Sequence, residues 1–161
     1  MHNSKTALDL RGTGYCASFN FRRTARAVTR LYDAALQKSG IRSTQFAILV
    51  AIAKKQPVSC GTLGDILVID ESTMTRSLKL LRKQGLITVS DRSKMRQRFL
   101  RMTPKGYQIL AKALPYWRRV QSEFQEAAGA GLWTKFRSEL ERLANLAVNL
   151  EKSETESSRH T

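Results

Sequence analysis

The chain has 161 residues, which is long enough for one compact domain, or two interlocked halves, with a substantial core. It carries 28 lysine and arginine residues against 13 acidic ones, so its formal net charge is +15 and its isoelectric point is near 10.5. A hydrophobic share of 42% excludes disorder of the whole chain. No apolar run approaches the roughly 20 residues of a membrane span. The excess of positive charge favours a polyanionic partner.

Sequence motifs give no sign of secretion or of catalysis. The N-terminus lacks the apolar segment of a signal peptide. Cys16 and Cys60 are too few for a disulfide framework and do not have metal-ligand spacing. His2 and His160 lie near the ends of the chain, and no HExxH or GxSxG motif occurs. We therefore expect a cytoplasmic protein that is not an enzyme and uses no metal ion or other cofactor.

The first third of the chain is expected to be helical. Residues 1–14 are polar and glycine-punctuated, which favours a flexible arm. From there to Gly40, apolar residues recur at helical spacing. Residues 43–55 are apolar on nearly every side, as is typical of a buried helix. Beyond Pro57, a short helix is predicted that Ser59 can cap.

Residues 70–85, DESTMTRSLKLLRKQG, form the segment that the other elements are expected to hold. One face of this predicted helix is apolar and would anchor it: Met74, Leu78 and Leu81. Another face has a hydroxyl near its start and cations further along: Ser72, Arg76, Lys79 and Lys83. Asp70 or Glu71 can cap the first turn, and Gly85 suits the C′ position. Such a helix suits a DNA major groove, and the alternative is a surface helix with a solvated basic face.

After Gly85 the hydrophobic period changes to two, which predicts strands in LITVS (86–90) and RFLRM (98–102). The residues between them, 91–97, form a short cationic tip. Thr103 and Pro104 are a strong helix-start signal. The helix that follows is expected to turn these residues inward: Leu110, Leu114, Trp117 and Phe124. A last helix has apolar residues three and four apart: Leu132, Phe136, Leu140, Leu143, Ala147 and Leu150.

This order of elements predicts a mainly α protein with a small β-hairpin wing, a winged helix-turn-helix carried on an α-helical dimerisation frame. The DNA-binding domain is expected at 41–104. The helical dimerisation region is expected at 15–40 and 105–150, and a flexible tail at 151–161.

Charge and leftover apolar surface suggest how such a protein would work. Between Ser72 and Ser122 the only acidic residue is Asp91, so a basic helix and a basic wing tip would give two contacts on a duplex. The apolar stripes of the flanking helices favour a two-fold dimer that reads a near-palindromic site. A monomer whose helices cover their own domain is the alternative.

Three segments, TQFAILVAIA, LGDILVIDESTMTRSLKLLRKQGLI and FLRMTPKG, resemble the MarR family of transcriptional regulators in their order and spacing. The resemblance covers about residues 16–150. It implies an obligate homodimer with a winged helix on each side, bound to double-stranded DNA at a pseudo-palindromic operator. By position, it implies these DNA-facing residues in the recognition helix: Ser72, Thr73, Thr75 and Arg76. The basic face of the helix adds Lys79.

The wing departs from the family pattern. Members commonly carry an Asp-Arg-Arg run before the second strand, and the matching positions here are Lys94, Met95 and Arg96. Only Arg96 agrees, as the wing-tip arginine that enters the minor groove. The substitutions put the usual wing salt bridge in doubt and raise the charge of a wing that also carries Arg98.

The resemblance also implies an effector. Many members respond to small aromatic anions in a pocket between the dimer frame and the DNA-binding lobe, which Arg23, Tyr32 and Phe46 could line. Each of these is equally a normal packing or surface residue. Some relatives sense organic peroxides through a cysteine in the first helix. Cys16 lies near that place, before an arginine-rich turn of the kind that lowers a thiol pKa. The alternative for Cys16 is a buried small hydrophobe.

The sequence therefore predicts a sequence-specific, dimeric DNA-binding regulator, a repressor released by a small-molecule ligand or by thiol oxidation. An RNA-binding or ribosome-associated winged-helix protein is the alternative, because a charge of +15 attracts any polyanion. Exposed aromatic clusters that would bind unstacked bases are not evident in the sequence. A protein-interaction module that uses the winged helix as a scaffold would not need cations at both the helix and the wing.

Overall fold

The computed structural model describes residues 9–91 and 98–158. The chain divides into two compact units, Met1–Trp117 and Arg118–Thr161. No helix in the described part of the chain is long and apolar enough to cross a membrane.

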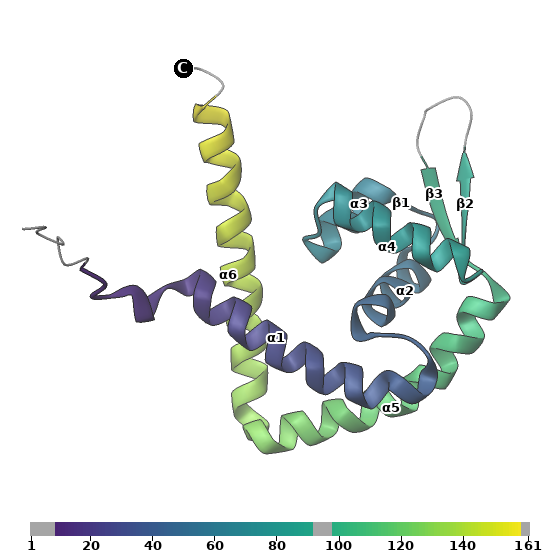
Figure 1. Cartoon of the computed structure of the whole chain (residues 1–161), viewed down its shortest axis with the longest axis horizontal. Coiled ribbons are helices and arrows are strands. Elements are labelled where there is room, and N and C mark those ends of the chain that lie inside the picture. Colours follow the sequence, from purple (N-terminus) through teal and green to yellow (C-terminus); the bar gives the residue numbers. More distant parts are fainter. Residues whose placement is uncertain (1–8, 92–97, 159–161) are drawn as a thin grey trace, which may run out of the picture. The chain divides into compact units, whose positions relative to one another are not determined.

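The first unit holds most of the secondary structure (Figure 1). Its elements, in chain order, are η1 (Thr13–Tyr15), α1 (Ala17–Leu36), η2 (Gln37–Ser39), α2 (Ser43–Lys55), β1 (Val58–Ser59), α3 (Cys60–Leu67), α4 (Glu71–Lys83), β2 (Ile87–Asp91), β3 (Arg98–Met102) and the start of α5 (Pro104–Ala128). The predicted order of helices and of the two wing strands is therefore confirmed.

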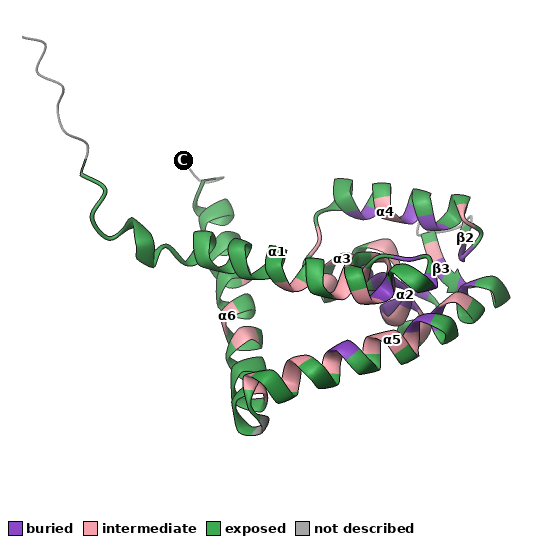
Figure 2. Ribbon diagram, turned by 60° about the horizontal axis from the view of Figure 1, so that its bottom comes forward, coloured by how far each residue is buried: buried purple, intermediate pink, exposed green. Residues whose placement is uncertain are grey.

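Helix α2 supplies much of the core of this unit, as its apolar composition predicted. Phe46, Leu49 and Ile52 are buried, and the last two have no exposed surface. They belong to a cluster with side chains from every neighbouring element, including Leu36 of α1 and Leu81 of α4. Figure 2 shows this buried centre beneath α4. Burying side chains of this size contributes about 1.5–3 kcal/mol each, so α2 fixes the elements around it.

The wing is a three-stranded antiparallel sheet in the order β1-β3-β2. Strand β3 pairs with β2 along its whole length, with Ile87 opposite Met102. It also pairs with β1, where Val58 lies opposite Leu100. The sequence predicted only the hairpin. Strand β1 has two residues, too few to show a period, and it forms because tertiary packing brings Val58 against a buried strand.

The turn between α3 and α4 places a β-branched residue in the left-handed region. Val68 has φ = 50° and ends α3. The turn is closed by a hydrogen bond from the Ile69 N–H to the Gly64 carbonyl, at 3.0 Å. A Cβ on Gly64 would lie 3.2 Å from the Ile69 carbonyl oxygen, so the approach is close. Valine rarely adopts this conformation, which indicates local strain.

We therefore expect Val68→Gly to raise the free energy of unfolding by about 1 kcal/mol. The left-handed conformation costs a residue with a Cβ about 1–2 kcal/mol, and glycine avoids this cost. Glycine in turn loses about 0.5–1 kcal/mol more in backbone entropy on folding. The side chain is 64% exposed, so little packing is lost. Urea unfolding at one protein concentration measures the change. Ile69→Gly, at a half-buried position with negative φ, should destabilise, and a stability loss at both positions would contradict the strain argument.

The second unit contains the end of α5 and the whole of α6 (Ala130–Ser157), joined at Gly129 with φ = 92°. The rings of Phe124 and Trp133 meet edge to face, with centroids 5.5 Å apart. One stripe of α6 stays largely exposed in the single chain: Leu132, Phe136, Leu146 and Leu150.

Helix α6 continues into the segment that the sequence assigned to a tail. It runs to Ser157 instead of ending at Leu150. Hydroxyl groups in this part donate to carbonyls of the preceding turn, including Thr155 to Glu151 and Ser158 to Glu154, at 2.8 and 2.9 Å. The polar composition of residues 151–157 suggested a frayed tail, but polar side chains such as these are also accommodated on a solvent-exposed helix.

Candidate nucleic-acid interface and associated cavity

Helix α4 begins with a tightly bonded acidic cap. Asp70 Oδ1 accepts hydrogen bonds from the Ser72 hydroxyl at 2.6 Å and from the Thr73 backbone N–H at 2.8 Å. The Ser72 hydroxyl and then the Thr73 N–H hold the pKa of Asp70 well below its usual range. Asp70 is therefore ionised at neutral pH, and it serves as the predicted N-cap.

The two faces of α4 differ as predicted. Met74, Leu78 and Leu81 are buried and hold the helix to the core. The predicted contact residues of this helix are all exposed: Ser72, Thr73, Thr75, Arg76 and Lys79. Figure 2 shows the exposed side of α4 turned away from the buried centre. Burial of one face thus fixes which side chains the helix offers to a partner.

Arg76 lies back along α4 towards its N-terminus. Its Nε donates to the Ser72 carbonyl at 3.3 Å and its Nη2 to the Ser72 hydroxyl at 3.2 Å. These contacts use two of the five N–H donors of the guanidinium. The exposed side chain is thus oriented at the polar end of the helix and retains donors for a base edge or a phosphate.

Only part of the predicted wing contact lies within the described structure. Arg98 begins β3, is exposed, and shares a strand face with the buried Leu100. Cys60 is half-buried, and burial raises the pKa of its thiol. The positive charge of Arg98 acts in the opposite direction on this pKa. Lys94 and Arg96 lie outside the described residues, so their contacts stay predictions from the sequence.

The positive charge of the chain belongs entirely to the first unit. Residues 1–117 contain 21 lysines and arginines against 6 acidic residues, and residues 118–161 contain 7 of each. The unit that contains α4 therefore carries the whole formal charge of +15. A polyanion would be attracted to this unit rather than to α6.

The TPKG segment ties the C-terminal end of α4 to the start of α5. The Thr103 hydroxyl donates to the Gly85 carbonyl at 2.7 Å and accepts from the Gly106 N–H at 3.0 Å. Lys105 Nζ donates to the Gln84 carbonyl at 2.8 Å. The sequence predicts Thr103 as a helix N-cap, but no local pattern indicates that its hydroxyl also bonds to the Gly85 carbonyl.

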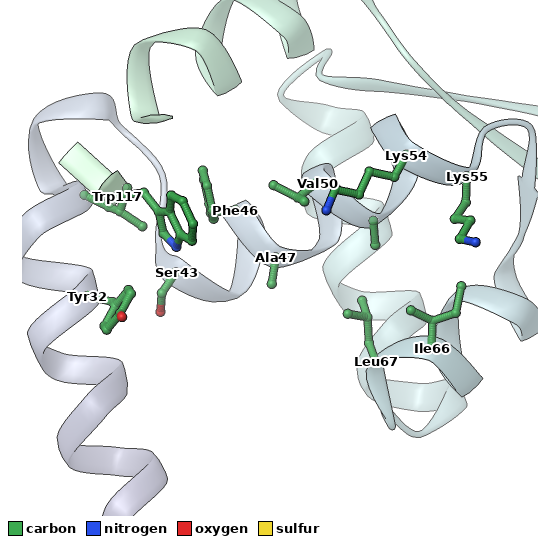
Figure 3. Close-up of a pocket in the computed structure, with 12 residues that line it drawn as sticks. Tyr32, Ser43, Phe46, Ala47, Val50, Lys54, Lys55, Ile66, Leu67 and Trp117 are labelled. Carbon is green, nitrogen blue, oxygen red and sulfur yellow. The ribbon is translucent and has the colours of Figure 1, made fainter. Parts of the chain in front are cut away.

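A cavity of about 430 Å³ opens beside α2 (Figure 3). Tyr32, Phe46 and Trp117 lie towards one end, and Lys54 and Lys55 towards the other. The Phe46 and Trp117 rings stack with centroids 5.8 Å apart at 21°. Burial raises the pKa of the Tyr32 phenol.

Of the residues predicted for an effector site, Tyr32 and Phe46 line this cavity. Arg23 is exposed on α1 and is not among the lining residues. Sequence reasoning treated Trp117 as core and did not consider Lys54 or Lys55. The sequence feature that could have indicated their place at the cavity is the pair of consecutive lysines in the last turn of an otherwise apolar helix.

Cys16 is exposed at the N-cap of α1. Its carbonyl accepts from the Asn20 side-chain amide at 2.9 Å. In the single chain Cys16 is not the buried small hydrophobe of the alternative, because α1 begins beyond the core and only its C-terminal end is buried. In the described ranges 9–91 and 98–158, no group of three or more histidine, cysteine or acidic side chains could hold a metal ion.

An anchored helix with an exposed basic face, followed by an antiparallel hairpin within a helical frame, is the architecture of a winged helix-turn-helix protein. The sequence of residues 39–97 matches the MarR family. The transcriptional regulator MosR of M. tuberculosis, whose crystal structure was solved in complex with DNA, is 34% identical with a TM-score of 0.75. That match covers 82% of this chain and 96% of MosR. The chain belongs to the MarR family of transcriptional regulators, which confirms the resemblance seen in the sequence.

Two further comparisons agree. An HTH-type transcriptional regulator of Staphylococcus aureus strain Mu50 is 35% identical over 85 residues, which are 52% of this chain and 58% of that relative. This chain thus spans a little over half the length of the relative. PcaV of Streptomyces coelicolor, solved with its natural ligand, shares the fold with a TM-score of 0.74 at 23% identity. The match covers 88% of this chain and 98% of the PcaV chain.

Proposed function

We propose that this protein is a sequence-specific, homodimeric DNA-binding repressor that a small-molecule ligand or thiol oxidation releases from its operator. The observation that carries the proposal is the exposed polar and basic face of α4, on a helix whose other face is buried. The DNA complex of the 34% identical MosR supports duplex DNA as the partner. Nothing in the comparisons supports the RNA-binding alternative. We expect the protein to act in the cytoplasm.

In this proposal α4 enters the major groove. Ser72, Thr75 and Arg76 would face base edges, because they lie at the exposed N-terminal end of the helix. Thr73 and Lys79 would bind phosphates, and the wing residues Lys94, Arg96 and Arg98 would extend the contact.

Competition binding tests the proposal. A duplex selected by the protein from a random pool is titrated against structured RNA and heparin at rising salt. Phosphate contacts weaken with salt for all three polyanions, whereas base contacts persist for the selected duplex alone. The selected duplex should therefore stay bound at salt concentrations that release RNA and heparin. Equal retention of all three would contradict sequence-specific DNA binding.

The exposed stripe of α6 supports a homodimer. Leu132 and Leu150 are about 60% exposed, and Phe19 and Leu31 of α1 are also uncovered. Apolar patches that run along helices mark association surfaces. A second copy is the simplest partner, because a two-fold axis would cover the same stripe on both chains and pair their α4 helices.

We expect Leu146→Glu to weaken self-association by about tenfold or more, because a charge would enter an apolar interface. Sedimentation at micromolar concentration measures the monomer–dimer equilibrium. Asn145→Glu makes the same charge change at the neighbouring exposed position, on another side of α6, and should leave the dimer intact. A monomeric wild type, or equal effects of both substitutions, would overturn the dimer.

The cavity beside α2 is the proposed effector site. Its walls are apolar, Tyr32 and Trp117 offer aromatic surface, and Lys54 and Lys55 lie at its other end. A planar aromatic anion matches this combination, because the ring would be desolvated between side chains while the cations face its charge. Of the residues predicted from sequence, Tyr32 and Phe46 are the ones that we propose for this role.

We propose Cys16 as the thiol for oxidative release. An organic hydroperoxide would transfer one oxygen to the thiolate sulfur, giving a sulfenic acid and an alcohol. Hydroperoxide should then release DNA from the wild type and from Cys60→Ser but not from Cys16→Ser, because Cys16 is exposed and the pKa of Cys60 is raised. Fluorescence anisotropy of labelled operator measures release. Release from the Cys16→Ser protein would remove Cys16 from the mechanism.

A further inference from the structure

A side-chain amide pair links α2 to the C-terminal end of α4. Gln45 Oε1 accepts from the Arg42 backbone N–H at 2.9 Å, which caps the first turn of α2. That bond orients the Gln45 amide, so its nitrogen faces the C-terminal end of α4. It donates to Gln84 Oε1 at 3.1 Å. The two residues are 39 positions apart in the sequence, and both are half-buried.

Gln84 sits where α4 ends, and it is bonded to both α2 and α5. It is the C-cap of α4, and its carbonyl accepts from Lys105 of α5 at 2.8 Å. The next residue, Gly85, takes φ = 71° and is bonded to Thr103. The backbone here is thus held by α5, while the Gln84 side chain is held by α2. Movement of α2 relative to α4 would act directly on this bond.

The first turn of α2 is also a wall of the cavity. Ser43 lines it, and both the N–H and the hydroxyl of Ser43 donate to Asp33 of α1, at 2.7 and 2.6 Å. Phe46, adjacent to Gln45, stacks on Trp117 inside the cavity. An occupant that separates these rings would therefore shift the turn that carries the Gln45 amide.

We propose that the Gln45–Gln84 hydrogen bond couples the Phe46–Trp117 end of the cavity to the position of helix α4, with Gln84 as a positioning residue. The inference rests on the proposed DNA-binding function and adds the contact through which ligand and DNA affect each other. Coupling between two binding events is reciprocal. In this proposal, DNA that shifts α4 also shifts the Phe46–Trp117 contact, so we expect it to change the environment of Trp117 even when no effector is present.

This reciprocity gives a test that does not need the effector. The chain has two tryptophans, so Trp133→Phe leaves Trp117 as the only one. In that background the protein is saturated with its selected duplex, and the emission of Trp117 is compared with and without DNA. Anisotropy of the labelled duplex, recorded in the same titration, separates binding from the optical response.

Two substitutions at Gln84 separate the hydrogen bond from side-chain shape. Gln84→Met keeps the length of the side chain but removes the acceptor, so the emission change at saturation should fall about fivefold or more. Gln84→Glu keeps an oxygen that accepts from Gln45 and should retain most of the change. Gln108→Met, at an exposed position on α5, is the matched control and should behave as the wild type.

Each outcome decides the inference. A full emission change in Gln84→Met, or none in the parent protein with DNA bound, would overturn the coupling and leave the proposed function intact. If the parent protein selects no duplex, the function fails and the inference fails with it. If Gln84→Met does not fold, Gln45→Glu combined with Gln84→Glu replaces it. At a pH where both carboxylates are ionised they repel each other and have no proton to share, so the response should be lost while the Arg42 cap is kept.

Discussion

Replacing Arg76 with alanine is expected to weaken binding to the selected operator by about 1–3 kcal/mol and to relax sequence preference at one base pair of each half-site. The guanidinium lies at the exposed end of α4, and its two bonds to Ser72 orient it there. A fork of donors held in this way can make a bidentate contact with a guanine edge. Titration against the operator and a random duplex at several salt concentrations measures both effects.

The wing-tip residue assigned from the sequence provides the contrast. Arg96→Ala should weaken binding almost evenly across sequences and reduce the salt slope by about 1 per subunit, because one fewer counterion is released. Discrimination that is lost in Arg96→Ala but kept in Arg76→Ala would reverse the roles assigned to the wing and to α4.

Gly106→Ala is expected to lower the free energy of unfolding by about 2–3 kcal/mol. A Cβ at this position would overlap the Leu86 carbonyl oxygen, and it would lie 3.1 Å from the carbonyl carbon of Leu86 and from Cε of Met102. Because the main obstacle is backbone, the first turn of α5 would have to move. The bonds from Thr103 to Gly85 and Leu86 would then lengthen or break.

Urea unfolding measures this loss, and Gly61→Ala is the matched control. Gly61 lies in α3 with no atom within 4 Å of an added Cβ. Alanine there should stabilise the protein by about 0.5–1 kcal/mol, since glycine has the higher entropy cost in a helix. If both substitutions had the same sign of effect, the close approach at Gly106 would not be what limits stability.

The sequence predicted those features that depend on local patterns. Apolar residues at helical spacing located α4, and the change to a period of two located the wing strands. The hydrogen-bonding side chains of Asp70 and Thr103 marked two helix starts. The placement of charged residues identified the exposed face of α4, because every residue of that face lies in one short segment of the sequence. The helical period of Tyr32 and Phe46 gave their elements and faces but not the cavity that they share.

The features that the sequence did not reveal depend on contacts between distant segments. Strand β1 exists because Val58 meets Leu100, and two residues cannot show a period. The bond between Gln45 and Gln84 joins residues 39 positions apart, and neither glutamine stands out among polar neighbours. The exposure of Cys16 reflects where α1 leaves the core, which composition does not encode. Tertiary geometry thus supplied the cavity and the junction at the end of α4.

The uneven distribution of charge has a consequence for ionic strength. Residues 118–161 are formally neutral, so two copies of α6 can approach each other without net repulsion. The units that carry the +15 repel one another until a polyanion neutralises them. Added salt shortens the range of both the repulsion between copies and the attraction to DNA, but it acts little on an apolar contact. In the proposed dimer, added salt should therefore weaken the binding to DNA without weakening the association of the subunits.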